Sequence, residues 1–168
     1  MAESEFTLSE RPDISMTVGG LIMAVANFEA TLMGCFATLL DQPVRIAAAI
    51  FENINNISAR AGIVFDLAEL QPDTPLGSAL ITHKDKISAA LRMRNRVAHG
   101  LYGFDEDNRQ VLLLENYLVK GKGPPKSSVL EPKILEAHAQ DLSDAAVALT
   151  NLIGDTDMTP RHRQKNGG

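Results

Sequence analysis

The chain lacks tryptophan, has a single cysteine and is poor in aromatic residues. Of its 168 residues, 45% are hydrophobic, 22% are charged and 5% are aromatic. The first two shares are those of an ordinary globular domain and exclude a disordered chain. Leucine, isoleucine, alanine and methionine must therefore fill the core, a mixture that favours helix over sheet. A lone cysteine excludes an internal disulfide, and the apolar surroundings of Cys35 predict that it is buried.

The sequence also lacks the features of an exported or membrane-spanning chain. Residues 1–5 are acidic where a signal peptide would be basic. The most apolar run, 18–26, contains two glycines and is too short to cross a bilayer. We therefore expect a cytoplasmic protein that does not engage a membrane.

Several catalytic and binding motifs are missing. There is no second cysteine for a zinc site, no HExxH sequence, no Walker loop and no GxGxxG fingerprint. No serine lies in a nucleophile elbow. We therefore expect neither a metal nor an organic cofactor.

The charge of the chain is uneven. A net charge of −5 argues against nucleic-acid binding over the whole surface. The segment 82–99 is nevertheless basic, with one acidic residue, Asp85, and these basic residues: Lys84, Lys86, Arg92, Arg94 and Arg96. Such a stripe is either a solvated helix face or the place where an anionic partner binds.

Apolar residues recur at helical spacing over four long segments. We predict these as helices: 13–40, 43–70, 76–99 and 131–153. Prolines and a glycine separate them, at Pro43, Pro72, Pro75 and Gly100. Long helices with short connections favour an all-α, antiparallel up-and-down bundle of four helices.

Between the third and fourth helices the pattern changes to strand, polar turn and strand. This predicts a β-hairpin at about 101–118, followed by a flexible basic loop at 120–128. A two-stranded ribbon is marginal alone, so the hairpin must pack on the bundle or on another subunit. We expect one domain, 13–153, between a flexible arm, 1–12, and a disordered tail, 154–168.

Polar residues at positions where the periodicity demands apolar ones are the most informative about function. On the third predicted helix, Arg94 falls in the middle of the apolar arc. Asn95 and His99 lie one turn apart at the edge of that arc, with Arg92 beside them. Arg96 faces the side opposite the apolar arc. The end of this helix is therefore the first candidate for a functional site.

An arginine on a buried stripe needs an anionic partner. Glu29 lies inside the apolar arc of the first predicted helix. We therefore predict an ion pair between Glu29 and Arg94 across the bundle. The alternative is that one or both side chains reach the surface.

Other polar residues allow a structural interpretation. His138 lies on the apolar face of the fourth predicted helix, where a core histidine with satisfied hydrogen bonds is favoured over a catalytic one. Asn53, Asn56 and Arg60 line one side of the second predicted helix. We interpret them mainly as an interface or hydrogen-bonding stripe.

The segment 94–100, Arg-Asn-Arg-Val-Ala-His-Gly, resembles the HEPN superfamily. In that family an arginine, often followed by asparagine, precedes a histidine by four to six intervening residues near the end of a long helix. The likeness in architecture covers about 13–153, whereas specific residues match only at 94–99. The resemblance implies a small helical bundle that dimerises and brings two such motifs together in one cleft.

The resemblance also implies an activity. Many HEPN proteins are metal-independent endoribonucleases, including toxins and phage-defence effectors, and others are non-catalytic nucleotide-binding, RNA-binding or interaction modules. Carried over to this chain, Arg94 and His99 would be the catalytic pair and Asn95 the supporting residue. Histidine suits proton transfer near neutral pH, and arginine suits the charge on a phosphate. A third alternative is an unrelated helical interaction protein that carries the same spacing.

Two departures from the family pattern qualify the assignment. Arg92 also has a permitted spacing, and on an ideal helix it lies closer to His99 than Arg94 does, so which arginine contacts phosphate stays open. A toxin subgroup carries a tyrosine two residues after the histidine, whereas Tyr102 follows by three. Arg96 and Tyr102 are weaker candidates for substrate contact. The expected partners are a second copy, RNA or a nucleotide, and an antitoxin or nucleotidyltransferase.

Overall fold

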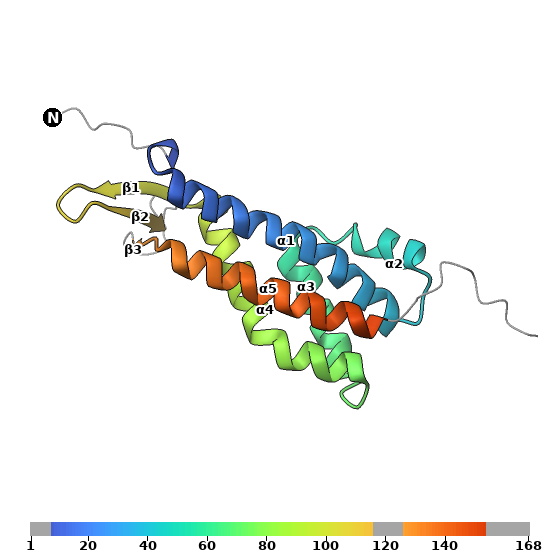
Figure 1. Cartoon of the computed structure of the whole chain (residues 1–168). Helices are drawn as coiled ribbons and strands as arrows, with labels where there is room; N and C mark the ends of the chain where they lie inside the picture. The colour runs from blue at the N-terminus through green and yellow to red at the C-terminus, as the bar shows by residue number, and fades with distance from the viewer. Residues whose placement is uncertain (1–7, 116–125, 154–168) are drawn as a thin grey trace, which may run out of the picture. The chain divides into compact units, whose positions relative to one another are not determined.

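The computed structural model describes residues 8–115 and 126–153, most of which are helical. The helices are η1 (Leu8–Glu10, a 3-10 turn), α1 (Pro12–Leu39), α2 (Val44–Phe51), α3 (Ile57–Glu69), α4 (Pro75–His99) and α5 (Pro132–Ile153) (Figure 1). The strands are β1 (Leu101–Asp105), β2 (Gln110–Glu115) and β3 (Lys126–Val129). They form an antiparallel sheet in the order β1-β2-β3. The chain is therefore mainly α, with a small sheet.

The chain divides into two compact units. One contains Met1–Phe28 and Lys84–Ala145, and the other contains Glu29–His83 and Ala146–Gly168. Helices α1, α4 and α5 each contribute residues to both units.

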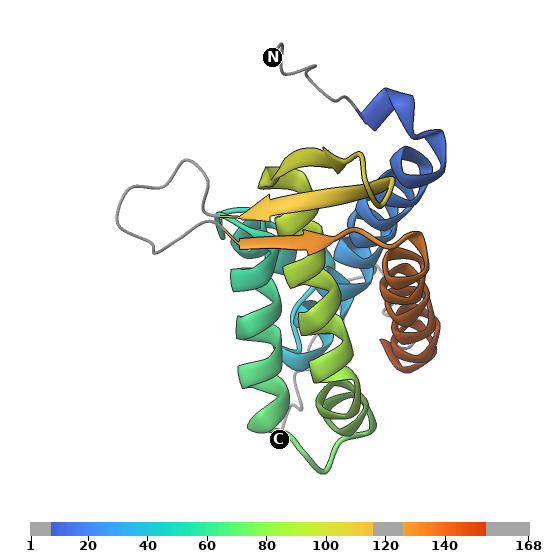
Figure 2. The same cartoon turned by 90° about the vertical axis from the view of Figure 1, so that its left-hand side faces the viewer.

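The first unit contains the sheet and the end of α4. Figure 2 shows the three strands side by side, with β1 continuing from the C-terminal end of α4. Gly100 forms this junction, and its N–H donates to the carbonyl of Arg96 at 2.8 Å. A Cβ at Gly100 would lie 2.4 Å from Cδ1 of Leu113 and 2.7 Å from that carbonyl oxygen. Only glycine therefore fits between the helix and the sheet without a shift of the backbone.

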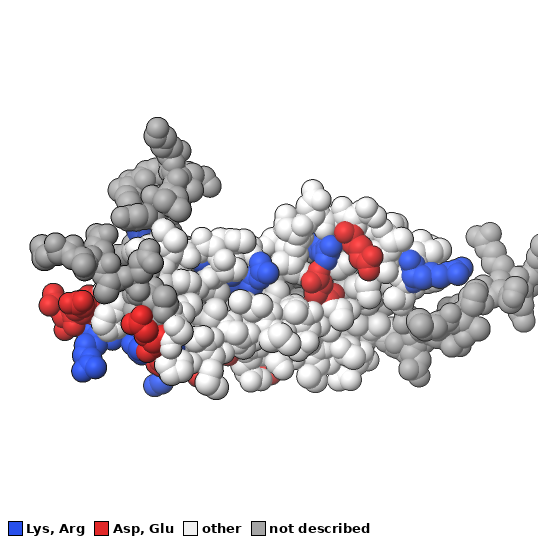
Figure 3. Space-filling model, turned by 90° about the horizontal axis from the view of Figure 1, so that it is seen from above, with Lys and Arg blue, Asp and Glu red and all other residues white. Residues whose placement is uncertain are grey.

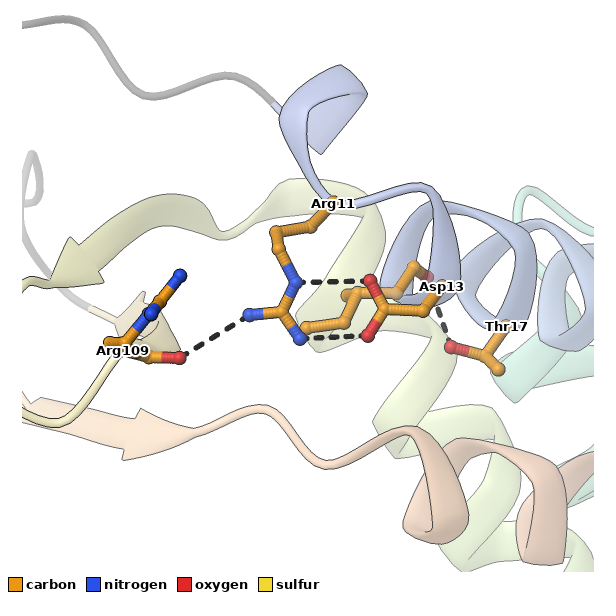
Figure 4. Close-up of polar contacts among 5 residues, drawn as sticks. Arg11, Asp13, Thr17 and Arg109 are labelled. Carbon is orange, nitrogen blue, oxygen red and sulfur yellow. Dashed lines mark hydrogen bonds and ion pairs between the residues drawn. The ribbon is translucent and has the colours of Figure 1, made fainter.

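Hydrogen bonds from Arg11 fasten the start of α1 to the turn between β1 and β2. Its Nε and Nη2 donate to the carboxylate of Asp13 at 3.0 and 2.7 Å, and Nη1 donates to the carbonyl of Arg109 at 3.4 Å (Figure 4). The hydrogen bond from Arg11 lowers the pKa of Asp13. Thr17 donates to the carbonyl of Ile14 one turn further along α1.

The second unit contains a break that the sequence analysis did not predict. Residues 43–70 form two helices, α2 and α3, and not one. Asn56 begins α3, because its side chain accepts a hydrogen bond from the N–H of Ala59 at 2.9 Å. Such N-capping satisfies a backbone donor that an uninterrupted helix would not expose. The apolar periodicity continues through the break, so it could not reveal it.

Arg60 holds this break in place. Its Nε donates to the carbonyl of Ile54 at 3.0 Å and its Nη2 to that of Glu52 at 3.2 Å. Its guanidinium lies 5.1 Å from the ring centroid of Phe51, and its Nη1 pairs with Glu29 of α1. One side chain thus satisfies two carbonyls between the helices and links them to α1.

The other predicted elements agree with the structure to different degrees. The helices predicted at 13–40, 76–99 and 131–153 are confirmed to within a residue. The hairpin is confirmed as far as 115, but the predicted loop 120–128 contributes residues to a third strand, β3. Part of the predicted arm, 1–12, forms η1. Residues 116–118 and the predicted disordered tail, 154–168, lie outside the described residues.

Helix α1 is more apolar than its longest uninterrupted run indicated. By length and composition it is able to cross a membrane, with a mean hydropathy of 1.5 over its most apolar window, 39% of which is buried. The run 18–26 alone underestimates the apolar length of this segment, because the helix extends over 28 residues. A buried core helix passes the same test, so this property alone assigns no location.

Candidate functional site

The last two turns of α4 present basic residues on an exposed face. Arg92 and His99 are exposed, and Arg96 is half-buried. Their spacings of four and three residues place all three on one side of a helix with 3.6 residues per turn. Positive charge near a helix C-terminus is favoured by the helix dipole. We call Arg92, Arg96 and His99 the basic face of α4.

Arg94 does not belong to this face. It is half-buried, and its Nη1 donates to Oδ1 of Asn95 at 3.1 Å. Its Nε is buried and has no hydrogen-bond partner within residues 8–115 and 126–153. A buried donor without a partner costs about 1–3 kcal/mol. Arg94 therefore orients Asn95, whereas Arg92 is the arginine that shares an exposed side with His99.

The partner of Glu29 differs from the predicted one. Glu29 forms its ion pair with Arg60, and the predicted pairing with Arg94 is wrong. Helical angles correctly place Glu29 on an inward face, but they do not reveal which neighbouring helix that face meets. Glu29 and Arg60 belong to one compact unit and Arg94 to the other.

Arg96 links α4 to the sheet. Its Nη2 donates to Oγ of Ser128 on β3 at 3.0 Å. A shallow pocket lies beside this contact, lined by Met93, Arg96, Leu113, Ser128, Val129, Leu130, Glu131 and Ile134. Ser128 was not predicted from the sequence, because a four-residue strand after a glycine- and proline-rich stretch has too short a pattern to be recognised.

Tyr102 has a structural contact that competes with a role in substrate binding. Its hydroxyl donates to the carbonyl of Val97 in the last turn of α4. Burial raises the pKa of Tyr102. The side chain thus satisfies one of the carbonyl groups that every helix leaves unpaired at its end.

Two further residues, Cys35 and His138, were considered for a chemical or structural role. Cys35 is fully buried as predicted, and burial raises the pKa of its thiol to about 12. It is therefore a neutral thiol near pH 7, not a nucleophile. His138 is half-buried, and its Nδ1 has no hydrogen-bond partner among the residues that the structure describes. The satisfied hydrogen bonding predicted for His138 is not observed there.

The described residues contain no group of three or more His, Cys, Asp or Glu side chains able to hold a metal ion. The chemistry that this part of the chain offers is that of an exposed imidazole and an exposed guanidinium on the same side of α4, about two helical turns apart. An imidazole moves protons near neutral pH, and a guanidinium binds phosphate oxygens in a fixed geometry. No protein-family model, curated protein or solved structure matches the chain.

Proposed function

We propose that this chain is a HEPN-like, metal-independent endoribonuclease that acts as a homodimer. The observation that supports it most is the basic face of α4. Arg92 and His99 share one exposed side of the helix, and neither has a hydrogen-bond or ion-pair partner within the described ranges. An arginine and a histidine that are both open to solvent can meet the same phosphate group.

In this proposal the helices form an antiparallel up-and-down bundle, in which α2 and α3 together replace one bent helix. Two copies bring the ends of their α4 helices into one cleft. Each copy then contributes one His99, so that the composite site holds both an acid and a base. The lengths of α1, α4 and α5 support this arrangement, because long helices, here of 28, 25 and 22 residues, favour bundles.

The proposed reaction is transesterification of RNA. One His99 removes the proton from a ribose 2′-hydroxyl, whose oxygen attacks the adjacent phosphorus. The bond from phosphorus to the 5′-oxygen breaks, and the second His99 donates a proton to that oxygen. The products are a 2′,3′-cyclic phosphate and a 5′-hydroxyl. The cationic side chain of Arg92 stabilises the charge that builds up on the phosphate oxygens.

The roles of the other residues follow from their contacts. Arg94 is a positioning residue that orients Asn95 through the hydrogen bond of 3.1 Å. Arg96 holds Ser128 of β3 against α4 and leaves the guanidinium beside the pocket. The hydroxyl of Tyr102 is already bound to Val97, so a partner nucleotidyltransferase would have to break this contact to modify it.

A second candidate is a non-catalytic module that binds RNA or a nucleotide. The half-burial of Arg94 favours it, because the arginine of the family motif does not share the exposed side of His99. In this case Arg92 and His99 bind a phosphate without cleaving the chain. Under either proposal the protein is cytoplasmic, and a basic antitoxin would complement its net charge of −5.

The experiment is cleavage of a mixed RNA substrate by the purified protein in excess chelator. The variants are His99→Ala, Arg92→Ala and Arg94→Ala. His83→Ala controls for the loss of a histidine, and Arg45→Ala controls for the loss of an exposed arginine. Circular dichroism checks that each variant folds.

We expect wild-type protein and both controls to produce cyclic-phosphate ends, and His99→Ala to produce none. Arg92→Ala should lower the rate more than Arg94→Ala, because Arg92 is the exposed arginine. RNA that is bound but left intact by wild-type protein would favour the binding module. Cleavage that persists in folded His99→Ala would exclude this site as the origin of the activity.

A further inference from the structure

The shallow pocket of the first unit is built from the C-terminal half of α4, from β2 and β3, and from the start of α5. Its volume of about 160 Å³ is below the roughly 300–1,000 Å³ of sites that enclose a drug-sized ligand. The pocket therefore admits one ring system, with the rest of a ligand outside. Most of its lining is apolar: Met93, Leu113, Val129, Leu130 and Ile134. We call it the α4–β3 pocket.

Three polar side chains complete the lining of the α4–β3 pocket: Arg96, Ser128 and Glu131. Arg96 is half-buried, and its Nη2 donates to Oγ of Ser128 at 3.0 Å, which holds the guanidinium against β3. Because the Ser128 oxygen accepts this hydrogen bond, its own hydrogen can be donated to a ligand. Glu131 is exposed and supplies two acceptor oxygens. The pocket thus combines donors, a charged acceptor and apolar side chains.

Guanine is the nucleobase that matches this combination best. Its O6 and N7 accept hydrogen bonds, and arginine is the side chain that most often binds these two atoms together. Its N1–H and its 2-amino group donate side by side, so that a carboxylate such as that of Glu131 can accept from both. Adenine does not offer a carboxylate two such neighbouring donors. A simple anion fits less well, because the Glu131 carboxylate repels it.

The α4–β3 pocket adjoins the basic face of α4. Arg96 belongs to both, and the pocket and the basic face lie in the same compact unit. His99 follows Arg96 by three residues, which is about 4.5 Å along the axis of a helix. A nucleotide whose phosphate lies at His99 and Arg92 can therefore direct its base toward Arg96 and the pocket.

Contacts to phosphate alone leave little affinity for RNA. The face drawn in Figure 3 carries lysine and arginine side chains only in scattered groups, among larger uncharged areas. The proposed site counts Arg92 and His99 as the phosphate ligands of each copy. Since nonspecific affinity grows with the number of phosphates that are neutralised, two cations contribute modestly. A pocket for a base would add both affinity and sequence preference.

We propose that the α4–β3 pocket binds a guanine base. Arg96 and Ser128 donate to its O6 and N7, and Glu131 accepts from its N1–H and 2-amino group. The apolar side chains contact the faces of the ring. The assignment of this base to an RNA substrate rests on the proposed function, whereas the pocket itself is testable with a nucleoside that has no phosphate.

The first test is isothermal titration calorimetry with guanosine, inosine and adenosine. We expect guanosine to bind about tenfold more tightly than adenosine, and inosine to bind less tightly than guanosine because it lacks the 2-amino group. Glu131→Gln should reduce the preference for guanosine over inosine. Glu136→Gln, at another exposed glutamate near the start of α5, is the matched control and should keep it. Absent guanosine binding, or a full preference in folded Glu131→Gln, would overturn the proposal.

The second test fills the pocket. Ile134→Trp places a larger side chain in its lining, and Val147→Trp is the matched control at an exposed apolar position of the same helix. We expect Ile134→Trp to abolish guanosine binding and Val147→Trp to retain it. Guanosine binding that persists in folded Ile134→Trp would place the ligand elsewhere and overturn the proposal.

Sequencing of the cyclic-phosphate ends separates this proposal from that of nuclease activity. We expect the wild-type protein to cut next to guanosines. Guanosine binding that Ile134→Trp abolishes, in a protein that leaves RNA intact, would support the pocket and reject the nuclease. Cleavage without base preference, in a protein that does not bind guanosine, would support the nuclease and overturn the pocket.

Discussion

Among single residues, Asp41 and Arg109 have backbone conformations that glycine adopts more easily, with φ of 50° and 53°. Asp41 follows the end of α1. The N–H of Gln42 donates to the carbonyl of Ala37, and the N–H of Asp41 donates to that of Thr38. These two hydrogen bonds form a Schellman motif with Asp41 at its left-handed position. An aspartate tolerates this conformation, but its Cβ makes it unfavourable.

Replacing Asp41 with glycine should therefore stabilise the protein. We expect Asp41→Gly to raise the free energy of unfolding by about 0.5–1 kcal/mol, measured by urea denaturation. Ala30→Gly in the interior of the same helix is the control and should lower it by about 1 kcal/mol. Equal losses in both variants would show that relief of backbone strain does not outweigh the flexibility that glycine adds.

Asp105 provides a test that depends on pH. The side-chain amide of Asn108 donates to its carboxylate at 2.9 Å, and the backbone N–H of Asn108 donates at 3.1 Å. Both hydrogen bonds favour the charged form and lower the pKa of Asp105. The stability that they add is present above the pKa of Asp105 in the unfolded chain. It is lost as the pH falls through the lowered pKa in the folded protein.

An NMR titration should find the pKa of the Asp105 carboxyl below that of an aspartate in a peptide. We expect Asn108→Ala to raise it toward the ordinary value, because the side-chain hydrogen bond is the larger cause of the shift. Asn55→Ala, which removes an exposed amide elsewhere, should leave it unchanged. An unaltered titration in Asn108→Ala would contradict the hydrogen bonds described at this turn.

Among the elements, α2 and α3 depend on one side chain of α3. The Arg60 side chain is 18% exposed and that of its partner Glu29 is 35% exposed. Arg60 contacts the two carbonyls of the break as well as Glu29. Removing one member of a partly buried pair leaves the other charge and the carbonyls without their donor, which costs more than an exposed ion pair contributes.

We expect Arg60→Ala to lower the free energy of unfolding by about 2–3 kcal/mol. Glu29→Gln should cost less, because an amide oxygen still accepts a hydrogen bond from the guanidinium. Arg45→Ala, at an exposed position of α2, should change stability by less than about 0.5 kcal/mol. Thermal or urea denaturation measures all three. Similar stabilities for Arg60→Ala and Arg45→Ala would show that Arg60 does not hold the break.

For the whole molecule, net charge and the charge of the site have opposite signs. The chain carries −5, while the basic face of α4 is cationic. A local positive site on an acidic protein attracts phosphate at short range, and salt screens that attraction. Binding of RNA should therefore involve few phosphates and depend on salt only modestly.

The salt dependence of RNA binding can be measured by fluorescence anisotropy, with labelled RNA and the inactive His99→Ala protein. The logarithm of the association constant should fall linearly with the logarithm of salt concentration. Adding Arg92→Ala should make that slope shallower by about 0.7, the value for one single-stranded phosphate contact. Adding Arg45→Ala should leave it unchanged. Identical slopes with and without Arg92 would exclude it as a phosphate ligand.

The sequence allowed the mainly helical class and the ends of three helices to be predicted, because periodicity and prolines are local signals. It also indicated the inward position of Glu29. The break at 52–56 and the strand β3 were not predictable from local pattern. Ile54, Ile57 and Ala61 carry the apolar periodicity through the break. Strand β3 is defined by its pairing with β2, in which Val129 lies opposite Leu112 and Ser128 opposite Leu113.

Helical periodicity alone singled out an arginine on an apolar stripe and a histidine near a helix end. The contacts of these residues became clear only from the fold. Glu29 pairs with Arg60, Arg94 donates a hydrogen bond to Asn95, and Arg92 is exposed on the side of His99. Helical angles depend only on neighbours along the chain, whereas the partner of a side chain depends on which helices pack together.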